Sequence, residues 1–306
     1  MATSLPGRRD EAWRYSDLKA LERAHALPAN DAIAEAVTLA DGETRRLGLA
    51  PDDSQRATLT LEVPAGVSAT LVESLGGGGW LDRAVTVRLG AGARLTHVIL
   101  QTAGAEAVVT AAYTAALAAD ARYQVHLGNV GGALGRVAMD VTLATGADFT
   151  LGGVLLGNAG QTVELVSRVV HAEPGATSQQ TVRSVLAGKA TANYLGKILV
   201  APGAQKTDAA QSSKALLLAR TASANTKPEL EIHADDVKCA HGATVGELDA
   251  QALFYMATRG IDPAEARALL TQAFLGDVLD AIADEALREE VSALAIGRLR
   301  VLVGGA

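Results

Sequence analysis

The chain contains a single cysteine and few aromatic residues, and these two scarcities limit its possible cross-links and the composition of its core. One cysteine among 306 residues excludes an internal disulfide and is typical of a protein from a reducing compartment. Aromatic residues make up only 3% of the sequence, whereas all hydrophobic residues make up 49%. The core must therefore be built mainly from small aliphatic side chains, which together with 31 glycines favours thin, repetitive packing.

Basic clusters and long apolar runs are also missing. The formal net charge is −7, and no stripe of lysine and arginine marks a surface for nucleic acid. The longest uncharged run, Phe149–Val163, is too short and too polar to span a bilayer. The N-terminal residues lack the apolar segment of a signal peptide. We therefore expect a cytoplasmic protein that has neither nucleic acid nor a membrane as a partner.

The hydrophobic pattern divides the chain into three regions. Residues 1–55 are predicted to form a helical N-terminal region, because apolar residues in Asp10–Ala26 recur at near-helical spacing. Over residues 56–246 the pattern changes to strict alternation, as in Val137–Leu143, which indicates strands with one buried face. Residues 247–306 return to helical spacing and are predicted to form a helical C-terminal region.

A recurring corner divides the strand region into similar units. Each corner is a turn residue followed by a small apolar residue, and successive corners lie 26 to 33 residues apart. The corners are Gly66-Val67, Gly92-Ala93, Asp120-Ala121, Gly146-Ala147, Gly175-Ala176, Gly203-Ala204 and a weaker copy at Asp236-Val237. This spacing predicts a mainly β fold, a β-solenoid of the parallel β-helix type, whose stacked units bury one continuous core. A β-sandwich, which also has regularly spaced strands, is the alternative.

The C-terminal region begins with clear helix signals. Asp249 is placed to cap a first helix that ends before Gly260, and Asp262-Pro263 is a strong start for a second. A solenoid has an open end that must be covered. These helices either cover that end or present an apolar stripe to a partner.

Cys239 and His241 are the best candidates for chemistry. Side chains alternate between the two faces of a strand, so this pair points the same way, with Cα atoms about 6.6 Å apart. Thiolate and imidazole are good ligands for iron and iron–sulfur centres, but two ligands cannot close a four-ligand site. An unbroken strand would add Glu231 and His233 to this face, but Ala234-Asp235-Asp236 looks like a corner that breaks the register.

Two other interpretations of the pair remain open at this stage. In one, Cys239 and His241 form a nucleophilic dyad of a β-solenoid hydrolase or lyase, oriented by Asp235, Asp236 or Glu247. In the other, the chain is a structural interaction module in which a buried thiol lies beside a hydrogen-bonded histidine. No complete phosphate-binding or dinucleotide-binding motif is present.

The segment Thr226–Gly246 resembles the signature of the SufD family, whose members belong to the SUF machinery for iron–sulfur cluster assembly. The continuation Leu253–Asp262, the N-terminal Glu11–Ser16 and the segment Gln211–Leu217 are also similar to that family. The resemblance implies a right-handed parallel β-helix flanked by helical regions. It further implies a non-catalytic subunit of a complex with the related scaffold SufB and the ABC-type ATPase SufC.

The resemblance also implies roles for particular residues. The family histidine that contributes to a cluster at the interface with SufB matches His241, and a neighbouring family cysteine matches Cys239. No cofactor would be bound stably by the chain alone, whereas iron or an iron–sulfur cluster would be held transiently in complex with SufB. The part that docks on SufC matches the C-terminal helices, with the candidate contacts Asp249, Phe254, Tyr255, Arg259, Ile261, Leu270 and Phe274.

The likeness is to SufD rather than to SufB, because the essential cysteine of SufB aligns near Ala222 and no cysteine lies there. An unpaired strand edge is adhesive. We therefore expect the isolated chain to form a homodimer through edge strands that SufB would otherwise cover.

Overall fold

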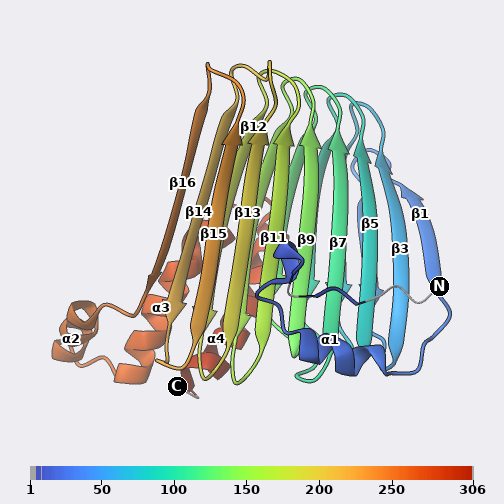
Figure 1. Cartoon of the computed structure of the whole chain (residues 1–306). Coiled ribbons are helices and arrows are strands. Elements are labelled where there is room, and N and C mark those ends of the chain that lie inside the picture. The colour runs from blue at the N-terminus through green and yellow to red at the C-terminus, as the bar shows by residue number, and fades with distance from the viewer. Residues whose placement is uncertain (1–4, 8, 305–306) are drawn as a thin grey trace.

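The computed structural model describes residues 5–7 and 9–304, and most of them lie in two parallel sheets that face each other (Figure 1). The first sheet contains, in spatial order, β1 (Ile33–Thr38), β3 (Ser54–Val63), β5 (Trp80–Leu89), β7 (Val108–Leu117), β9 (Leu134–Leu143), β11 (Thr162–His171), β13 (Thr191–Val200) and β15 (Ser223–Ile232). The second contains β2 (Thr44–Leu49), β4 (Ser68–Leu75), β6 (Arg94–Gln101), β8 (Arg122–Asn129), β10 (Asp148–Gly157), β12 (Thr177–Leu186), β14 (Asp208–Leu217) and β16 (Lys238–Gly246). Odd-numbered strands pair only with odd and even only with even, so the chain winds as a β-solenoid.

The corners predicted from the repeat are confirmed. The turn residues at 66, 92, 120, 146, 175 and 203 all adopt positive φ, between 57° and 85°. Glycine adopts that conformation without a steric penalty and aspartate tolerates it, which explains the residue types found there. The β-solenoid prediction is therefore correct, and the β-sandwich alternative is wrong because every strand pairing is parallel.

The predicted N-terminal helical region is only partly helical. A 3-10 helix spans Glu11–Trp13 and α1 spans Leu18–His25, but β1 and β2 already belong to the solenoid. Ile33 and Val37 lie on the same face of β1 and pack against the core, and a corner with positive φ at Gly42 joins the two strands. Helical spacing therefore ends after α1, and the prediction of a helical region is wrong for residues 33–49.

The solenoid core lies between the two sheets. It is built from alanine, valine and leucine side chains that alternate inward along every strand, as the composition predicted. Its aromatic members are Tyr113, Tyr123, Phe149 and Tyr194, so six of the ten aromatic residues lie outside this core. A column of small aliphatic side chains buried on every turn gives one continuous core, in which each turn is stabilised by its neighbours.

Three helices follow the last strand: α2 (Ala250–Thr258), α3 (Pro263–Leu279) and α4 (Glu285–Gly304). Asp249 and Asp262 accept hydrogen bonds from the first turns of α2 and α3, as the helix signals predicted. The longer helices α3 and α4 pack on the outer face of the second sheet, mainly against β10 and β12, and do not cover the open end of the solenoid (Figure 1).

An apolar outer face explains this packing. Outward side chains of the second sheet form an apolar surface, made of Val72, Val98, Leu100, Val130, Val154, Leu156, Val185, Ala187 and Leu216. α3 and α4 bury this surface away from water, which stabilises the fold by about 25 cal/mol for each Å² of apolar surface buried. Gly152 lets α3 approach closely, since a Cβ there would lie 3.2 Å from Val278. In the described part of the chain, no helix is long and apolar enough to cross a membrane.

Candidate functional site

The last turn of the solenoid leaves two strand edges unpaired. β15 pairs only with β13 in the first sheet, and β16 pairs only with β14 in the second. Both strands lie side by side at one end of the molecule (Figure 1). Their free backbone groups make that end a template for pairing with another strand.

The interior of the solenoid is open at this end. Ile232 and Val245 occupy inward positions on β15 and β16, yet they remain 40% and 48% exposed. Their register partners one turn earlier, Val200 and Ala215, are buried. Apolar side chains that face a core but lack its next layer indicate a missing partner surface.

The structure brings Cys239 and His241 together on β16, as predicted, on its inward face. Cys239 pairs in register with Ala209 and His241 with Gln211, and both of these are buried inward residues of β14. Cys239 is half-buried against the small cluster that contains Ala209, whereas His241 is exposed. One of the two candidate ligands, His241, is therefore exposed at the open end.

Burial changes the chemistry of the cysteine. Loss of solvent around the sulfur, and secondarily the negative charge of Asp208, raise the pKa of the Cys239 thiol above its ordinary value. The neutral thiol is a poor nucleophile and must lose its proton before it binds iron. The environment therefore favours His241 over Cys239 as the residue ready to bind a metal.

The other acidic and imidazole side chains of this segment lie elsewhere. The strand is interrupted between Ile232 and Lys238, so the expected corner is present and the register is broken. Glu231 and His233 belong to the first-sheet side and form a surface pair 3.0 Å apart. Hydrogen bonds from Lys197 and then from His233 hold the pKa of Glu231 at about 2.

His241 continues a polar row inside the solenoid. Gln180, Gln211 and His241 occupy successive register positions on β12, β14 and β16. Both glutamines are buried, and the side-chain Nε2 atom of each has no hydrogen-bond partner among the residues that the structure describes. One turn further in, the same position is the apolar Leu151, so the polar side chains of this row are confined to the turns nearest the open end.

The candidate docking residues divide into two groups. Phe254 and Tyr255 on α2 are 72% and 59% exposed, and the Arg259 guanidinium lies over the Tyr255 ring at 5.2 Å. Asp249 caps α2, and the backbone N–H of Ile261 donates to Met256, so these two shape the helix. Leu270 is half-buried on α3, and Phe274 packs against the buried cluster beneath α3 and α4. The structure therefore presents α2 as the accessible part of this surface.

Sequence reasoning missed a charged network inside the core. Glu73, on an inward position of β4, accepts hydrogen bonds from Arg83 at 2.7 Å and contacts His97 at 2.9 Å. His97 also contacts the Tyr123 hydroxyl at 2.9 Å. All four side chains are fully buried. The detectable signal was the alternation itself, which places Arg83 and His97 on the inward face of their strands.

A second missed cluster holds the N-terminal segment on the first sheet. The Glu164 carboxylate accepts hydrogen bonds from Ser16 at 2.7 Å, Arg136 at 2.8 Å and Asn193 at 2.7 Å. The Trp13 ring lies 4.0 Å from the guanidinium carbon of Arg136. The segment Glu11–Ser16 is thus fixed by residues more than 100 positions away, which no local pattern reveals.

Within the part of the chain that the structure describes, no group of three or more histidine, cysteine, aspartate or glutamate side chains is arranged to hold a metal ion. The accessible features are instead the open solenoid end, where His241 is exposed, and the helix α2 with its exposed Phe254 and Tyr255. α2 follows the last strand at this end of the molecule (Figure 1).

Comparisons with known proteins agree with this architecture. Residues 48–274 match the SUF system FeS cluster assembly SufBD core domain. The chain is 40% identical to the Escherichia coli iron–sulfur cluster assembly protein SufD over 123 residues, which is 40% of this chain and 29% of that protein. It is 35% identical to an iron–sulfur cluster assembly SufBD family protein of Synechocystis over 199 residues, which is 64% of this chain and 44% of the relative.

A third relative, a SufBD family protein of Mycobacterium leprae, is 27% identical over 95% of this chain and 90% of its own length. The matches to the first two relatives cover less than half of those proteins. The core-domain match nevertheless covers most of the chain, including the whole solenoid from β3 to β16 and most of α3. As the SufD-like motif around His241 predicted, the chain belongs to the SufBD family of SUF-system iron–sulfur cluster assembly proteins.

Proposed function

We propose that this chain is a non-catalytic subunit of a SUF assembly complex in which His241 supplies one ligand to a nascent iron–sulfur cluster. The observation that carries the proposal is the position of His241, which faces inward on the last strand and yet is exposed at the open end. Family membership supports iron–sulfur chemistry as the task, and the cluster would be cargo of the complex.

The remaining ligands would come from a partner. A neutral imidazole donates one nitrogen lone pair to iron, whereas cluster iron atoms each need several ligands. Cys239, two residues away on the same face, offers its sulfur as a second ligand beside the His241 imidazole once the thiol loses its proton. A related solenoid of the SufB type, joined end to end with this one, would place its own ligands opposite His241.

A hydrolase or lyase that uses a Cys239/His241 dyad is less well supported. The raised pKa of Cys239 disfavours the thiolate that such an enzyme needs. The proposed orienting groups Asp235 and Asp236 lie in the corner before β16, and Glu247 follows its end. The family resemblance and the acid–base properties of the cysteine both favour a scaffold role over catalysis.

We expect Val245→Glu to weaken association with a SufB-type partner at least about tenfold. Val245 is an inward side chain left half exposed at the open end, and a carboxylate there would be buried without a counter-charge in the complex. Calorimetric titration of the purified partner into each variant would measure the effect. Val301→Glu, on an exposed position of α4, is the matched control and should bind normally.

The same edges explain the expected homodimer of the isolated chain. Analytical ultracentrifugation should show a concentration-dependent dimer for the unmodified chain and for Val301→Glu, and mainly monomer for Val245→Glu. A strict monomer at micromolar concentration in every case would contradict self-association through β15 and β16.

We expect Phe254→Asp to weaken binding of the ATPase SufC at least about tenfold. Exposed aromatic side chains on a surface helix are typical anchors of an interface, and burying one contributes on the order of 1.5–3 kcal/mol. Pull-down with purified SufC, followed by calorimetry, would measure the loss. Val245→Glu provides the cross-control, because the variant altered at the solenoid end should still bind SufC. Equal loss in both variants would indicate general misfolding and contradict α2 as a separate docking site.

A further inference from the structure

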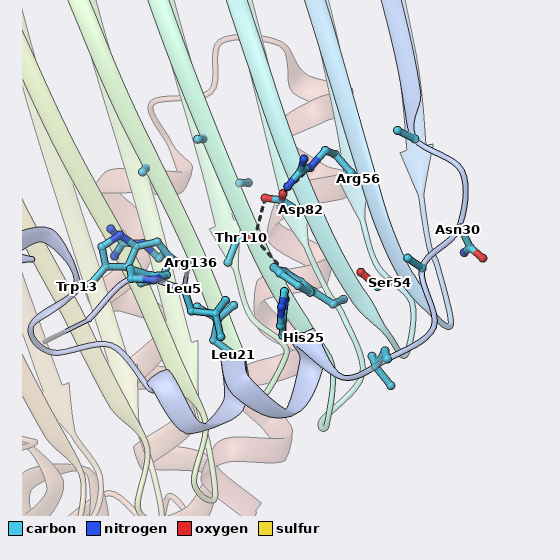
Figure 2. Close-up of a pocket in the computed structure, with 18 residues that line it drawn as sticks. Leu5, Trp13, Leu21, His25, Asn30, Ser54, Arg56, Asp82, Thr110 and Arg136 are labelled. Carbon is cyan, nitrogen blue, oxygen red and sulfur yellow. Dashed lines mark hydrogen bonds and ion pairs between the residues drawn. The ribbon is translucent and has the colours of Figure 1, made fainter. Parts of the chain in front are cut away.

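A cavity of about 630 Å³ lies between the N-terminal segment and the outer face of the first sheet, far in sequence from the solenoid end (Figure 2). Its walls come from the Glu11–Trp13 helix, from α1 and the loop that follows it, and from β3, β5, β7 and β9. Cavities of roughly 300–1,000 Å³ are the usual size for small-molecule sites. Neither His241 nor α2 contributes to it, so any role is separate from the proposed assembly site.

Aromatic residues are concentrated in this cavity. The chain has only two tryptophans, and both Trp13 and Trp80 line it. The His25 ring adds a third flat surface, edge-on to Trp80 with 5.8 Å between ring centroids. In a chain with 3% aromatic residues, this arrangement marks a place suited to stacking against a planar group.

Hydrogen bonds and charge hold both indoles in place. The Trp80 Nε1–H donates to the Thr110 hydroxyl at 3.0 Å, and Thr110 donates to Asp82 at 3.2 Å (Figure 2). The Trp13 ring lies against the Arg136 guanidinium, which is itself paired with Glu164. A site whose aromatic walls are fixed before binding loses less entropy when a ligand enters.

The charges around the cavity are already paired. Arg56 forms an ion pair with Asp82 at 3.1 Å, and Arg136 forms one with Glu164 at 2.8 Å. An anionic ligand would therefore find no free cation among these side chains. Each Asp82 oxygen accepts one hydrogen bond, from Arg56 or Thr110, which leaves acceptor capacity for a donor on the ligand.

The floor of the cavity is flat and open. Ala112 and Ala138 are register partners on the outward face of β7 and β9, and their methyl groups leave room above the sheet. We propose that the cavity binds an uncharged planar nitrogen heteroaromatic group of nucleobase or nucleoside size. Its ring would stack on the indoles, and a ring N–H or amino group would donate to Asp82.

Adenosine is a suitable probe, because it is neutral, planar and carries an amino donor. Titration into the full chain should quench tryptophan fluorescence saturably, since both indoles line the cavity. Ribose should have no effect, and adenosine monophosphate should bind no more tightly than adenosine, because both arginines are already paired. Absence of saturable quenching, or a clear preference for the monophosphate, would overturn the proposal.

Variants identify the site independently of fluorescence. In calorimetric titrations, Trp80→Leu should weaken adenosine binding about tenfold or more, as expected from loss of one stacking contact. Ala112→Leu, an exposed position that leaves the core intact, should weaken it similarly by filling the floor. Tyr255→Leu on α2 is the matched control and should bind normally. Unchanged affinity in both cavity variants would assign adenosine to another site and contradict the inference.

Discussion

His241→Ala should reduce cluster assembly by the SUF complex at least about tenfold while leaving the fold and the complex intact. Its imidazole is the accessible ligand at the open solenoid end, and loss of even an indirect contact to a metal site commonly costs 10–100-fold in affinity or activity. Because the His241 side chain is exposed, its removal should not lower the free energy of unfolding appreciably.

Cluster formation on the purified complex, followed by absorbance under anaerobic conditions, measures this effect. Cys239→Ser should cause a smaller loss, because the protonated thiol is the weaker ligand candidate. His233→Ala is the matched control: it removes an exposed histidine of the same segment that pairs with Glu231 on the first-sheet side. Full assembly by His241→Ala, or equal losses for His241→Ala and His233→Ala, would contradict the assignment.

Arg83→Met should destabilise the chain by about 3–5 kcal/mol. Arg83 and Glu73 are both fully buried, and removing Arg83 leaves the Glu73 charge inside the core with His97 as its remaining partner. The matched control is Arg88→Met on the same strand, whose pair with Glu62 is exposed and should contribute less than about 1 kcal/mol. Urea unfolding of both variants would measure the difference.

A double variant tests whether the loss of stability in Arg83→Met comes from the unpaired charge of Glu73. Arg83→Met combined with Glu73→Gln removes both charges and should recover much of the lost free energy of unfolding, since neither charge of the Arg83–Glu73 pair is then left buried alone. A loss for Arg83→Met no larger than that for Arg88→Met would show that the buried pair contributes little. A double variant less stable than Arg83→Met alone would indicate that Glu73 is stabilised chiefly by His97.

The same network gives the core a defined pH dependence. Burial opposes the charge of Glu73, but the His97 hydrogen bond and the charges of His97 and Arg83 outweigh it and lower the pKa of Glu73 from 4.5 to about 2. A carboxyl group with a depressed pKa stabilises the fold above its unfolded value and loses that contribution as pH falls toward the folded value. The network's contribution should therefore disappear between about pH 4.5 and pH 2.

The sequence predicted the solenoid because its corner chemistry is local. Gly66, Gly92 and Gly146 follow a steady repeat, and positive φ at those residues is a requirement that short sequence patterns display. The first turn was missed because Ile33 and Val37 lie four residues apart, which is a helical spacing, and Glu35 occupies the inward position between them.

The helix faces were harder to predict because they depend on the sheet they cover. Leu269 on α3 is exposed although it is apolar, whereas Thr271 and Leu275 are buried. Spacing alone leaves the rotation of a helix undetermined when apolar residues surround much of it. The apolar outer face formed by Val154 and Val185 selects the orientation, and that face is assembled from several turns.

For the candidate residues Cys239 and His241, the sequence predicted a shared strand face but not that this strand ends its sheet. Alternation placed Cys239 and His241 on one face, and the corner at residues 234–236 was correctly expected to separate them from Glu231 and His233. Whether β16 is an edge strand depends on where the chain leaves the solenoid, which only the three-dimensional arrangement shows. That edge position makes His241 accessible to a partner.

Pulsed electron paramagnetic resonance of the reduced cluster would show directly whether His241 is bound to it. The complex would be assembled with ¹⁵N-histidine in this chain only, and the cluster formed anaerobically on it. If His241 binds the cluster, we expect a ¹⁵N hyperfine coupling typical of a directly bound imidazole. This coupling should be present in the unmodified chain and in His233→Ala, and absent in His241→Ala. A cluster that forms without such a coupling, or one whose coupling persists in His241→Ala, would contradict His241 as a cluster ligand.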